Sequence, residues 1–291
     1  MFSGSIPALI TPFKNNTIDR DCFKALVERQ IVSGSSALVP VGTTGESATL
    51  SHEEHRLVVS LCIESAKGRV PIIAGCGSNS TAEAIGLVEF AKQQGADAGL
   101  VVCPYYNRPD QEGLEAHFKA INNAVSLPIF IYNVPSGTMS DILPETVGRL
   151  AKLPNIIGIK DATGDLSRVT QHRLFAGDKF IQLSGDDPSA LGHRAMGGAG
   201  CISVTANVAP DQNAAMHAAA AAGDYAKARD IEQKLIMLHK DLFVSPSPGP
   251  TKYAMSKLGL CEPEIRLPLT PPDASARGTI DNALRHAGLG G

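Results

Sequence analysis

Short apolar segments recur along the chain at a spacing of roughly 20 to 35 residues. Each is a continuous apolar run, not an alternation of apolar and polar positions, and this is the pattern of strands buried on both faces of a parallel sheet. The sequence therefore predicts eight strands, which are Ser5–Ile10, Ala37–Val41, Pro71–Gly75, Gly99–Cys103, Pro128–Tyr132, Ile156–Lys160, Phe180–Ser184 and Cys201–Thr205.

Segments with helical periodicity separate these runs. In one of them Ser51 and Glu54 predict a capping box at the helix start. Thr81 is a candidate cap for a later helix that ends near Gly95. The helices predicted after the first five strands are Asp19–Ser33, Ser51–Ala66, Ser80–Gln94, Gln111–Val125 and Pro144–Lys152. Eight strands alternating with helices predict an α/β protein of the (β/α)8 TIM-barrel class.

The alternative α/β architecture is a doubly wound open sheet, which calls for a glycine-rich phosphate turn after the first strand. Here that turn, Thr11–Lys14, contains no glycine. The segment Gly75–Ser80 begins as G-x-G but lacks the third glycine, and it follows the third strand. We therefore reject a dinucleotide-binding fingerprint.

The chain after the eighth strand reads as helical. An alanine-rich segment, Asp211–Ala222, is expected to close the barrel, and a rigid loop, Ser245–Pro250, follows a long helix. The three helices predicted beyond the barrel are Tyr225–Leu242, Thr251–Gly259 and Thr279–His286. The predicted organisation is a catalytic barrel over residues 1–224 and a C-terminal helical extension over residues 225–291.

Composition narrows the class of protein. The chain has 291 residues, of which 43% are hydrophobic and 19% charged, with a formal net charge of −3. No basic block suggests nucleic acid, and no apolar run is long enough to span a membrane. The N-terminus does not resemble a signal peptide. We expect a globular cytoplasmic protein.

The cysteines and histidines indicate neither disulfides nor metal. The six cysteines contain no C-x-x-C pair, and no H-x-H or H-E-x-x-H motif occurs. Cys103 and Cys201 lie in predicted strands and read as small core residues. A nucleophilic Cys103 is a minor alternative, although no histidine is placed to activate it. We predict no metal and no cofactor.

Lys160 ends the sixth predicted strand, and two interpretations of it are open. In the first it is a solvated lysine at a strand end, as most lysines are. In the second, partial burial disfavours the ammonium form, and the neutral amine attacks a carbonyl to form a Schiff base. Active sites of barrels lie at the C-terminal ends of the strands, so the neighbouring strand ends decide between the two.

Those strand ends carry hydroxyls and phenols. Thr43 and Thr44 lie between glycines after the second strand, where they could form a tight polar turn or hold a small carboxylate. Tyr106 follows the fourth strand and Tyr132 ends the fifth. A phenol near an amine can relay protons during imine formation, and this favours the chemical interpretation of Lys160.

The loop after the seventh strand adds information about the substrate. Asp186 and Asp187 follow Gly185 there, and their carboxylates repel a phosphate of the kind that many barrels bind after strands seven and eight. A sugar phosphate is therefore not expected.

At this point the chain resembles the dihydrodipicolinate synthase family of pyruvate-dependent, Schiff-base-forming lyases. The resemblance runs from Met1 to Leu289, and the Tyr-Tyr-Asn element favours the synthases over the sialic-acid lyases. The motifs that carry it are Gly42–Glu46, Tyr105–Pro109, Tyr132–Pro135, Gly158–Thr163 and Ser184–Asp187.

The resemblance implies a role for each candidate residue. Lys160 would form the Schiff base with pyruvate, and Tyr132 would shuttle protons. Thr44 and Tyr106 would complete a relay to solvent, with Tyr106 reaching into the site of a neighbouring subunit. The residues implied for pyruvate binding are Thr43, Thr44, Gly185 and Ile202. The enamine would then attack L-aspartate 4-semialdehyde, and cyclisation would give 4-hydroxy-tetrahydrodipicolinate, the first committed step of lysine and diaminopimelate biosynthesis.

The resemblance also implies an assembly and an effector. The family forms homotetramers built as dimers of tight dimers. Feedback inhibition by L-lysine would use a site at the tight-dimer interface. The matching residues are Ser47, Ala48, His52, His55, Asn79, Glu83 and Tyr105. His52 and His55 are three residues apart, so we expect them on one helix face; by themselves they read as solvated histidines at a helix start.

One position departs from the family. The synthases carry an arginine after Val134–Ser136 to hold the carboxylate of the second substrate, and this chain has Gly137. The alternatives are another cation such as Arg108, a different aldehyde, or weakened activity. A different aldehyde would mean a lyase of the 2-keto-3-deoxy sugar acid or N-acetylneuraminate type. A non-catalytic lysine-binding barrel is the further alternative.

Overall fold

The computed structural model describes residues 2–290 and forms two compact units. The first unit comprises Ser3–Pro71 with the chain from Ser203 onward. The second comprises Phe2 with Ile72–Ile202. These units differ from the organisation expected above, and the division at residues 224 and 225 stays a prediction.

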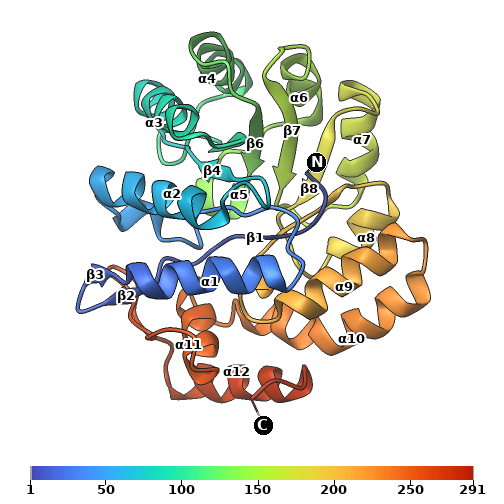
Figure 1. The fold of residues 1–291 in the computed structure, drawn as a ribbon. Helices are drawn as coiled ribbons and strands as arrows, with labels where there is room; N and C mark the ends of the chain where they lie inside the picture. The colour runs from blue at the N-terminus through green and yellow to red at the C-terminus, as the bar shows by residue number, and fades with distance from the viewer. Residues whose placement is uncertain (1, 291) are drawn as a thin grey trace. The chain divides into compact units, whose positions relative to one another are not determined.

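Parallel strands form the centre of the second unit (Figure 1). In their order across the sheet the strands are β9 (Gly200–Ser203), β8 (Ile181–Ser184), β7 (Ile156–Asp161), β6 (Ile129–Asn133), β5 (Ala98–Val102) and β4 (Ile73–Gly75). The helices between them are α3 (Thr81–Gln94), α4 (Gln111–Ala124), the short α5 (Pro135–Thr138), α6 (Pro144–Leu150), α7 (Ser167–Ala176) and α8 (Ala190–Ala195). Helices α3, α4, α6 and α7 lie along one side of these strands (Figure 1). Sequence order across a parallel sheet, with a helix after each strand, is the pattern of a (β/α)8 barrel.

Continuous burial explains why these runs are strands. All five residues of β6 are buried, as expected for a strand covered on both faces. Gly158 lets β7 approach its neighbours closely, because a Cβ there would lie 2.4 Å from the carbonyl oxygen of Ile181 and 2.6 Å from the Phe130 ring. The β6–β7 register places Tyr132 opposite Lys160.

The first unit contains β1 (Gly4–Pro7), the helices near both ends of the chain and an unpredicted hairpin. The elements are β2 (Phe13–Lys14), β3 (Thr17–Ile18), α1 (Arg20–Val32), the 3-10 turns η1 (Ser47–Thr49) and η2 (Thr205–Asn207), α2 (His52–Ala66), α9 (Pro210–Ala221), α10 (Tyr225–Asp241), α11 (Gly249–Lys257) and α12 (Ala274–His286). A buried apolar cluster joins α1 to α10, α11 and α12 through Leu26, Leu235, Met255 and Ile280. The predicted C-terminal helices are thus confirmed, and the fold class is the expected one.

The predicted second strand, Ala37–Val41, is wrong as a full strand. Only Leu38 and Val39 form isolated bridges, Val39 with Ala8, and the segment makes three backbone hydrogen bonds of 2.9–3.0 Å. Val41 adopts a left-handed φ of 51°, which bends the chain away from extended geometry before the polar turn begins.

The helix ends agree in part with those predicted from the sequence. The Ser51–Glu54 capping box is present. The cap of α3 is Ser80, not Thr81, because the Ser80 hydroxyl accepts the hydrogen bond from the Glu83 amide. Helix α12 begins at Ala274, five residues before the predicted Thr279, with Asp273 as its cap.

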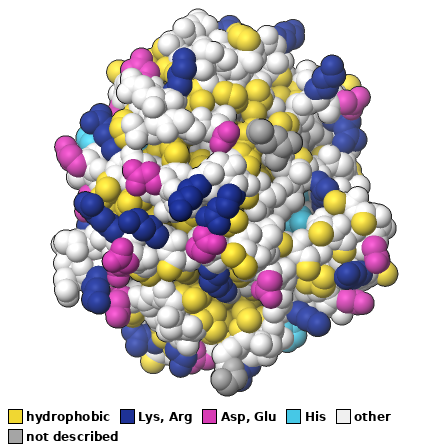
Figure 2. All heavy atoms as spheres, in the orientation of Figure 1, with side chains coloured by type: hydrophobic (Ala, Val, Ile, Leu, Met, Phe, Trp, Pro, Cys, Tyr) yellow, Lys and Arg dark blue, Asp and Glu magenta, His cyan; other side chains and the backbone are white. Residues whose placement is uncertain are grey.

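The molecular surface mixes charges of both signs. On the face drawn in Figure 2, Lys and Arg side chains are interspersed with Asp and Glu. Within residues 2–290, none of the helices combines the length and the apolar character needed to cross a membrane.

Candidate active site

Lys160 is buried at the end of β7, with 6% of its surface exposed. The interpretation as a solvated strand-end lysine is therefore wrong. Its amine lies 3.9 Å from the centre of the Tyr132 ring, on the neighbouring strand β6. Within its unit, no described residue forms a hydrogen bond or ion pair with this amine. The electron-rich face of the ring can stabilise positive charge on this nitrogen.

Gly185 lies against the aliphatic part of Lys160. A Cβ at this position would be 2.8 Å from Lys160 Cε and 2.7 Å from Ala162 Cβ, so any larger residue would displace the lysine. The backbone N–H of Gly185 donates to the Asp161 carbonyl at 2.7 Å, which fixes the glycine next to β7. The structure thus brings three predicted residues, Lys160, Tyr132 and Gly185, together in one unit. Ile202 is buried in β9, two strands from β7.

Thr43 and Thr44 belong to the first unit, in a tight turn that ends at Glu46. Thr44 is buried whereas Thr43 is exposed. The Thr11 hydroxyl donates to the Gly45 carbonyl at 2.7 Å, and the Glu46 amide donates to the Thr43 carbonyl at 3.0 Å. Glu46 has a left-handed φ of 57°, a conformation that costs energy in a non-glycine residue. The surrounding contacts hold this strained turn in one shape.

Tyr106 is displayed on the surface of the second unit. It is 90% exposed with a φ of 69°, and Arg108 is also left-handed, with a φ of 47°. The loop is anchored by Asn107, whose side-chain amide donates to the Asn79 carbonyl at 2.9 Å. A strained, anchored loop that presents an aromatic ring to solvent is suited to contact with another molecule.

The predicted effector residues are divided between the units. In the first unit His52 is exposed and His55 buried at the start of α2, so His55 is not the solvated histidine expected from its position alone. In the second unit the Ser78 hydroxyl donates to the Glu83 carboxylate. Tyr105 there is 39% exposed. Ser47 and Ala48 lie in η1.

Both cysteines considered earlier are buried free thiols. Burial raises the pKa of Cys103 and of Cys201 well above the usual thiol value. A thiolate is the nucleophilic form, so the alternative of a nucleophilic Cys103 is not supported. Among the described residues, no group of three or more His, Cys, Asp or Glu side chains is arranged to hold a metal ion.

Gly137 lies in α5 with space beside it. A Cβ at this position would meet Val134 Cγ2 at 3.8 Å, an ordinary contact. Glycine is therefore not required here by sterics. An arginine could be accommodated at this position without backbone strain.

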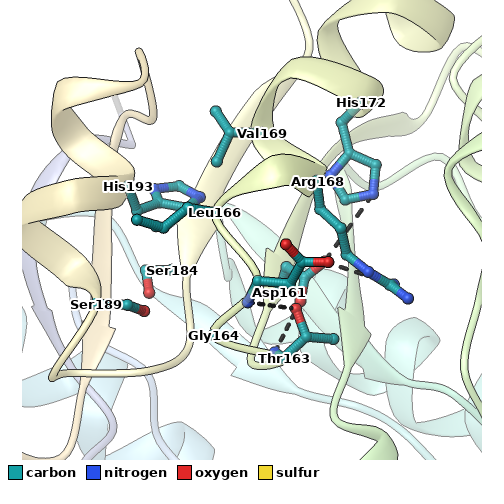
Figure 3. A pocket seen from close by; sticks show the side chains of 11 residues that line it. Asp161, Thr163, Gly164, Leu166, Arg168, Val169, His172, Ser184, Ser189 and His193 are labelled. Atoms are coloured by element: carbon teal, nitrogen blue, oxygen red, sulfur yellow. Dashed lines mark hydrogen bonds and ion pairs between the residues drawn. The ribbon is translucent and has the colours of Figure 1, made fainter.

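A polar group behind Lys160 was not predicted from the sequence. Asp161 follows the lysine and points to the other face of β7, into a small pocket with Arg168, His172 and His193 (Figure 3). Burial lowers the pKa of His193 to about 4. The Lys-Asp pair in the sequence was the available signal, since a second charged residue at the end of an apolar strand needs a partner.

A buried strand-end lysine beside a tyrosine, on a (β/α)8 scaffold, defines the class of Schiff-base-forming lyases. The family model described as the dihydrodipicolinate synthetase family matches residues 1–287. The chain belongs to this family, and it is a Schiff-base-forming lyase.

Similar proteins cover the whole chain. The 4-hydroxy-tetrahydrodipicolinate synthase of Hyphomonas neptunium is 67% identical over 291 residues, which is 99% of both proteins. The dihydrodipicolinate synthase of Acinetobacter baumannii, in a structure with pyruvate, is 46% identical with a TM-score of 0.97 over 99% of this chain and 100% of that one. The enzyme of Cyanidioschyzon merolae, in a structure with lysine bound, is 37% identical with a TM-score of 0.95 over 99% of each chain.

Proposed function

We propose that the chain condenses pyruvate with L-aspartate 4-semialdehyde to give 4-hydroxy-tetrahydrodipicolinate, in the cytoplasm, for lysine and diaminopimelate biosynthesis. The observation that carries this proposal is the buried Lys160 amine, free of hydrogen bonds within its unit and held against Tyr132 and Gly185. The names of the close relatives and the pyruvate-bound structure of the Acinetobacter baumannii enzyme support the choice of substrates.

The proposed chemistry uses the lysine as a covalent catalyst. The neutral Lys160 amine attacks the C2 carbonyl of pyruvate, and the resulting carbinolamine loses water to give an imine. Tyr132 donates a proton to the departing oxygen and is reprotonated through Thr44 and Tyr106. Loss of a methyl proton gives an enamine, whose carbon attacks the aldehyde of the second substrate.

The residues proposed for pyruvate binding divide into hydroxyl groups and apolar positions. Thr43 and Thr44, with the backbone N–H groups of their turn, would bind the carboxylate. Gly185 and Ile202 would leave room for the three-carbon skeleton. The strain at Glu46 supports this role, because a fixed turn presents its hydrogen-bond donors without reorganisation.

We further propose a homotetramer made of two tight dimers, with L-lysine bound at the tight-dimer interface. The exposed Tyr106 supports a contact between subunits. The proposed effector residues are Ser47, Ala48, His52, His55, Asn79, Glu83 and Tyr105. The lysine-bound relative from Cyanidioschyzon merolae supports this choice of effector. Isothermal titration with L-lysine should show binding together with inhibition, and no heat with no inhibition would exclude the effector site.

One experiment tests the catalytic proposal directly. The protein is incubated with pyruvate and borohydride, and the adduct is located by mass spectrometry. We expect one reduced pyruvate on Lys160, followed by turnover of aspartate semialdehyde in a coupled assay. A protein that binds L-lysine but traps no pyruvate would instead be a non-catalytic barrel.

A second candidate function follows from Gly137. Lyases that cleave 2-keto-3-deoxy sugar acids or N-acetylneuraminate share the Lys160 chemistry but need no arginine at this position. The same coupled assay with these substrates separates the two functions. Faster turnover of a keto-deoxy acid than of aspartate semialdehyde would favour the second.

A further inference from the structure

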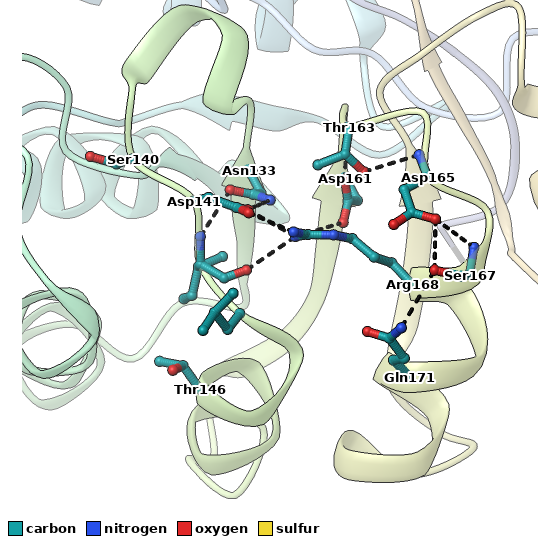
Figure 4. Close-up of polar contacts among 12 residues, drawn as sticks. Asn133, Ser140, Asp141, Thr146, Asp161, Thr163, Asp165, Ser167, Arg168 and Gln171 are labelled. Atoms are coloured by element: carbon teal, nitrogen blue, oxygen red, sulfur yellow. Dashed lines mark hydrogen bonds and ion pairs between the residues drawn. The ribbon is translucent and has the colours of Figure 1, made fainter.

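A network of charged hydrogen bonds connects the ends of β6 and β7 (Figure 4). Asp161 and Lys160 are neighbours in β7, so the network lies on the face of the sheet opposite to the Lys160 side chain. Arg168, on α7, is its centre. Its Nη2 donates to Asp141 Oδ2 at 2.5 Å and its Nη1 to Asp141 Oδ1 at 2.8 Å. Arg168 Nη1 also lies 3.9 Å from Asp161 Oδ2. The paired contact with Asp141 fixes both the position and the plane of the guanidinium.

The network reaches the residue that follows each catalytic candidate. Asn133 comes directly after Tyr132, and its amide donates to Asp141 Oδ1 at 2.8 Å. Asp161 comes directly after Lys160, and its carboxylate faces Arg168. Asn133 and Asp161 are also register partners on adjacent strands. Any shift of Arg168 is therefore passed to both strand ends.

Asp161 depends on Arg168 for charge compensation. Its Oδ1 accepts the Thr163 amide at 2.8 Å, whereas Oδ2 is buried without a hydrogen bond to any described residue. His172, 1% exposed, places Nε2 4.0 Å from that oxygen (Figure 3). Burial lowers the pKa of His172, so the imidazole is a weak source of positive charge. Without the guanidinium, the buried Asp161 carboxylate would have to move or recruit water.

We propose that Arg168 is a positioning residue for the Schiff-base reaction, acting through Asp141 and Asp161 to hold the Lys160 amine against Tyr132. This inference rests on the proposed role of Lys160. Arg168 does not touch the amine, so its removal disturbs the approach of Lys160 to the carbonyl more than the binding of pyruvate. Small displacements of reacting groups are costly, on the order of 100-fold for about 1 Å.

The test compares Arg168→Met with a matched control, Arg149→Met. Arg149 also joins two segments through a carboxylate, with Nε 2.5 Å from Glu115 Oε2, but its partners are on helices only. Arg149→Met loses its pair with Glu115, whereas Arg168→Met loses the pair with Asp141 and the longer one with Asp161. For each, the rate of borohydride-trapped adduct formation, kcat and the pyruvate KM are measured per folded protein.

We expect Arg168→Met to lower the trapping rate and kcat by about 10- to 100-fold, with the pyruvate KM changed by less than about threefold. Arg149→Met should leave all three unchanged. Arg168→Lys should recover part of kcat, because its ammonium can still approach Asp141. Equal kcat values for the two methionine variants would overturn the proposal. A wild-type protein that traps no pyruvate would instead overturn the function of Lys160.

A second variant keeps the test decisive if Arg168→Met does not fold. Asp141→Asn retains the side-chain volume and the contact to Asn133 but weakens the charged pair. We expect about a 3- to 10-fold loss of kcat. In the double variant Arg168→Lys/Asp141→Asn the losses should not multiply, since both changes act on one contact. Fully multiplicative losses, or wild-type kcat in Asp141→Asn, would contradict the network.

Discussion

Two buried lysines in this protein have opposite surroundings. Lys160, in the second unit, is 6% exposed, and within that unit its amine has no hydrogen-bond or ion-pair partner. Lys252, in the first unit, is fully buried. Its ammonium pairs with the Glu46 carboxylate and donates to the Glu264 carbonyl at 2.9 Å.

The difference distinguishes the lysine proposed to react from a structural one. Burial lowers the pKa of Lys252, and the Glu46 carboxylate opposes that shift. The ion pair holds the ammonium in place, and it also fixes Glu46 at the end of the proposed pyruvate-binding turn. The Lys160 amine lies against the Tyr132 ring and has no hydrogen bond within its unit, which leaves the nitrogen open to an incoming carbonyl. The partner, more than the depth of burial, decides what a buried lysine does.

Replacing Lys160 should produce the largest effect on activity. Lys160→Met removes the proposed nucleophile, and we expect no trapped pyruvate and a loss of kcat on the order of 10³-fold or more. The unfolding free energy should hold or rise, because no partner is left without its charge. Urea unfolding and adduct mass spectrometry measure the two quantities. Trapped pyruvate in Lys160→Met would show that another amine reacts, and it would overturn the assignment of the reaction to Lys160.

Replacing Lys252 should instead destabilise the protein. Lys252→Met removes the ion-pair partner of the buried Glu46 carboxylate and leaves it the Arg266 amide, at a cost of about 3–5 kcal/mol in unfolding free energy. Adding Glu46→Gln should restore part of that loss, since a neutral amide costs less to bury. Urea unfolding measures both variants, and trapping should persist in the folded fraction. A stable Lys252→Met protein that no longer traps pyruvate would mean that Lys252 takes part in the reaction with pyruvate.

The contrast also explains what the sequence could predict. Lys160 was recognisable because an apolar run ends in a charged residue. Lys252 lies within a helix with no such run, so its burial depends on packing from other parts of the chain. The pairing of Lys252 with Glu46 spans 206 positions, and no local pattern indicates it. For the same reason Arg168 and Asp141 were overlooked.

The strand predictions failed where local geometry changes. Six parallel strands of the second unit follow from their apolar runs, with ends shifted by a few residues. Ala37–Val41 is equally apolar, yet it forms only isolated bridges because the left-handed Val41 turns the chain. Apolarity predicted the burial of this segment correctly but could not predict its φ angles. Helices α7 and α8 were missed because their polar composition gives a weak periodic signal.

A buried base without a carboxylate partner should weaken the fold in acid. Burial lowers the pKa of His193 to about 4, so between pH 6.5 and about 4 the unfolded state binds the extra proton. The unfolding free energy therefore decreases as the pH is lowered through this window, by up to about 3 kcal/mol in total. Urea unfolding from pH 7 to pH 4 should show a shallower loss for His193→Asn. Part of the acid sensitivity should remain in this variant, because burial also lowers the pKa of His117 to about 4. Identical slopes would exclude His193 as a source of acid sensitivity.

The smallest expected effect concerns position 137, where this chain has glycine and the family resemblance implies arginine. Gly137→Arg supplies the guanidinium that the family resemblance implies for the carboxylate of the second substrate, and a Cβ at Gly137 meets only an ordinary contact. A charge-assisted contact of about 1.5–3 kcal/mol should raise kcat/KM for aspartate semialdehyde by roughly 10- to 150-fold.

The control for that substitution is Gly137→Gln, which adds a side chain without charge and should raise kcat/KM little. Trapping of pyruvate on Lys160 should be the same in both variants, because the first half-reaction precedes the aldehyde. Steady-state kinetics with each substrate varied in turn measure these values. An unchanged kcat/KM in Gly137→Arg would mean that another group, such as Arg108, already holds the carboxylate, or that the aldehyde is a different one. If the wild type cleaves a keto-deoxy acid faster than Gly137→Arg does, the second of these explanations holds, and the natural aldehyde is not aspartate semialdehyde.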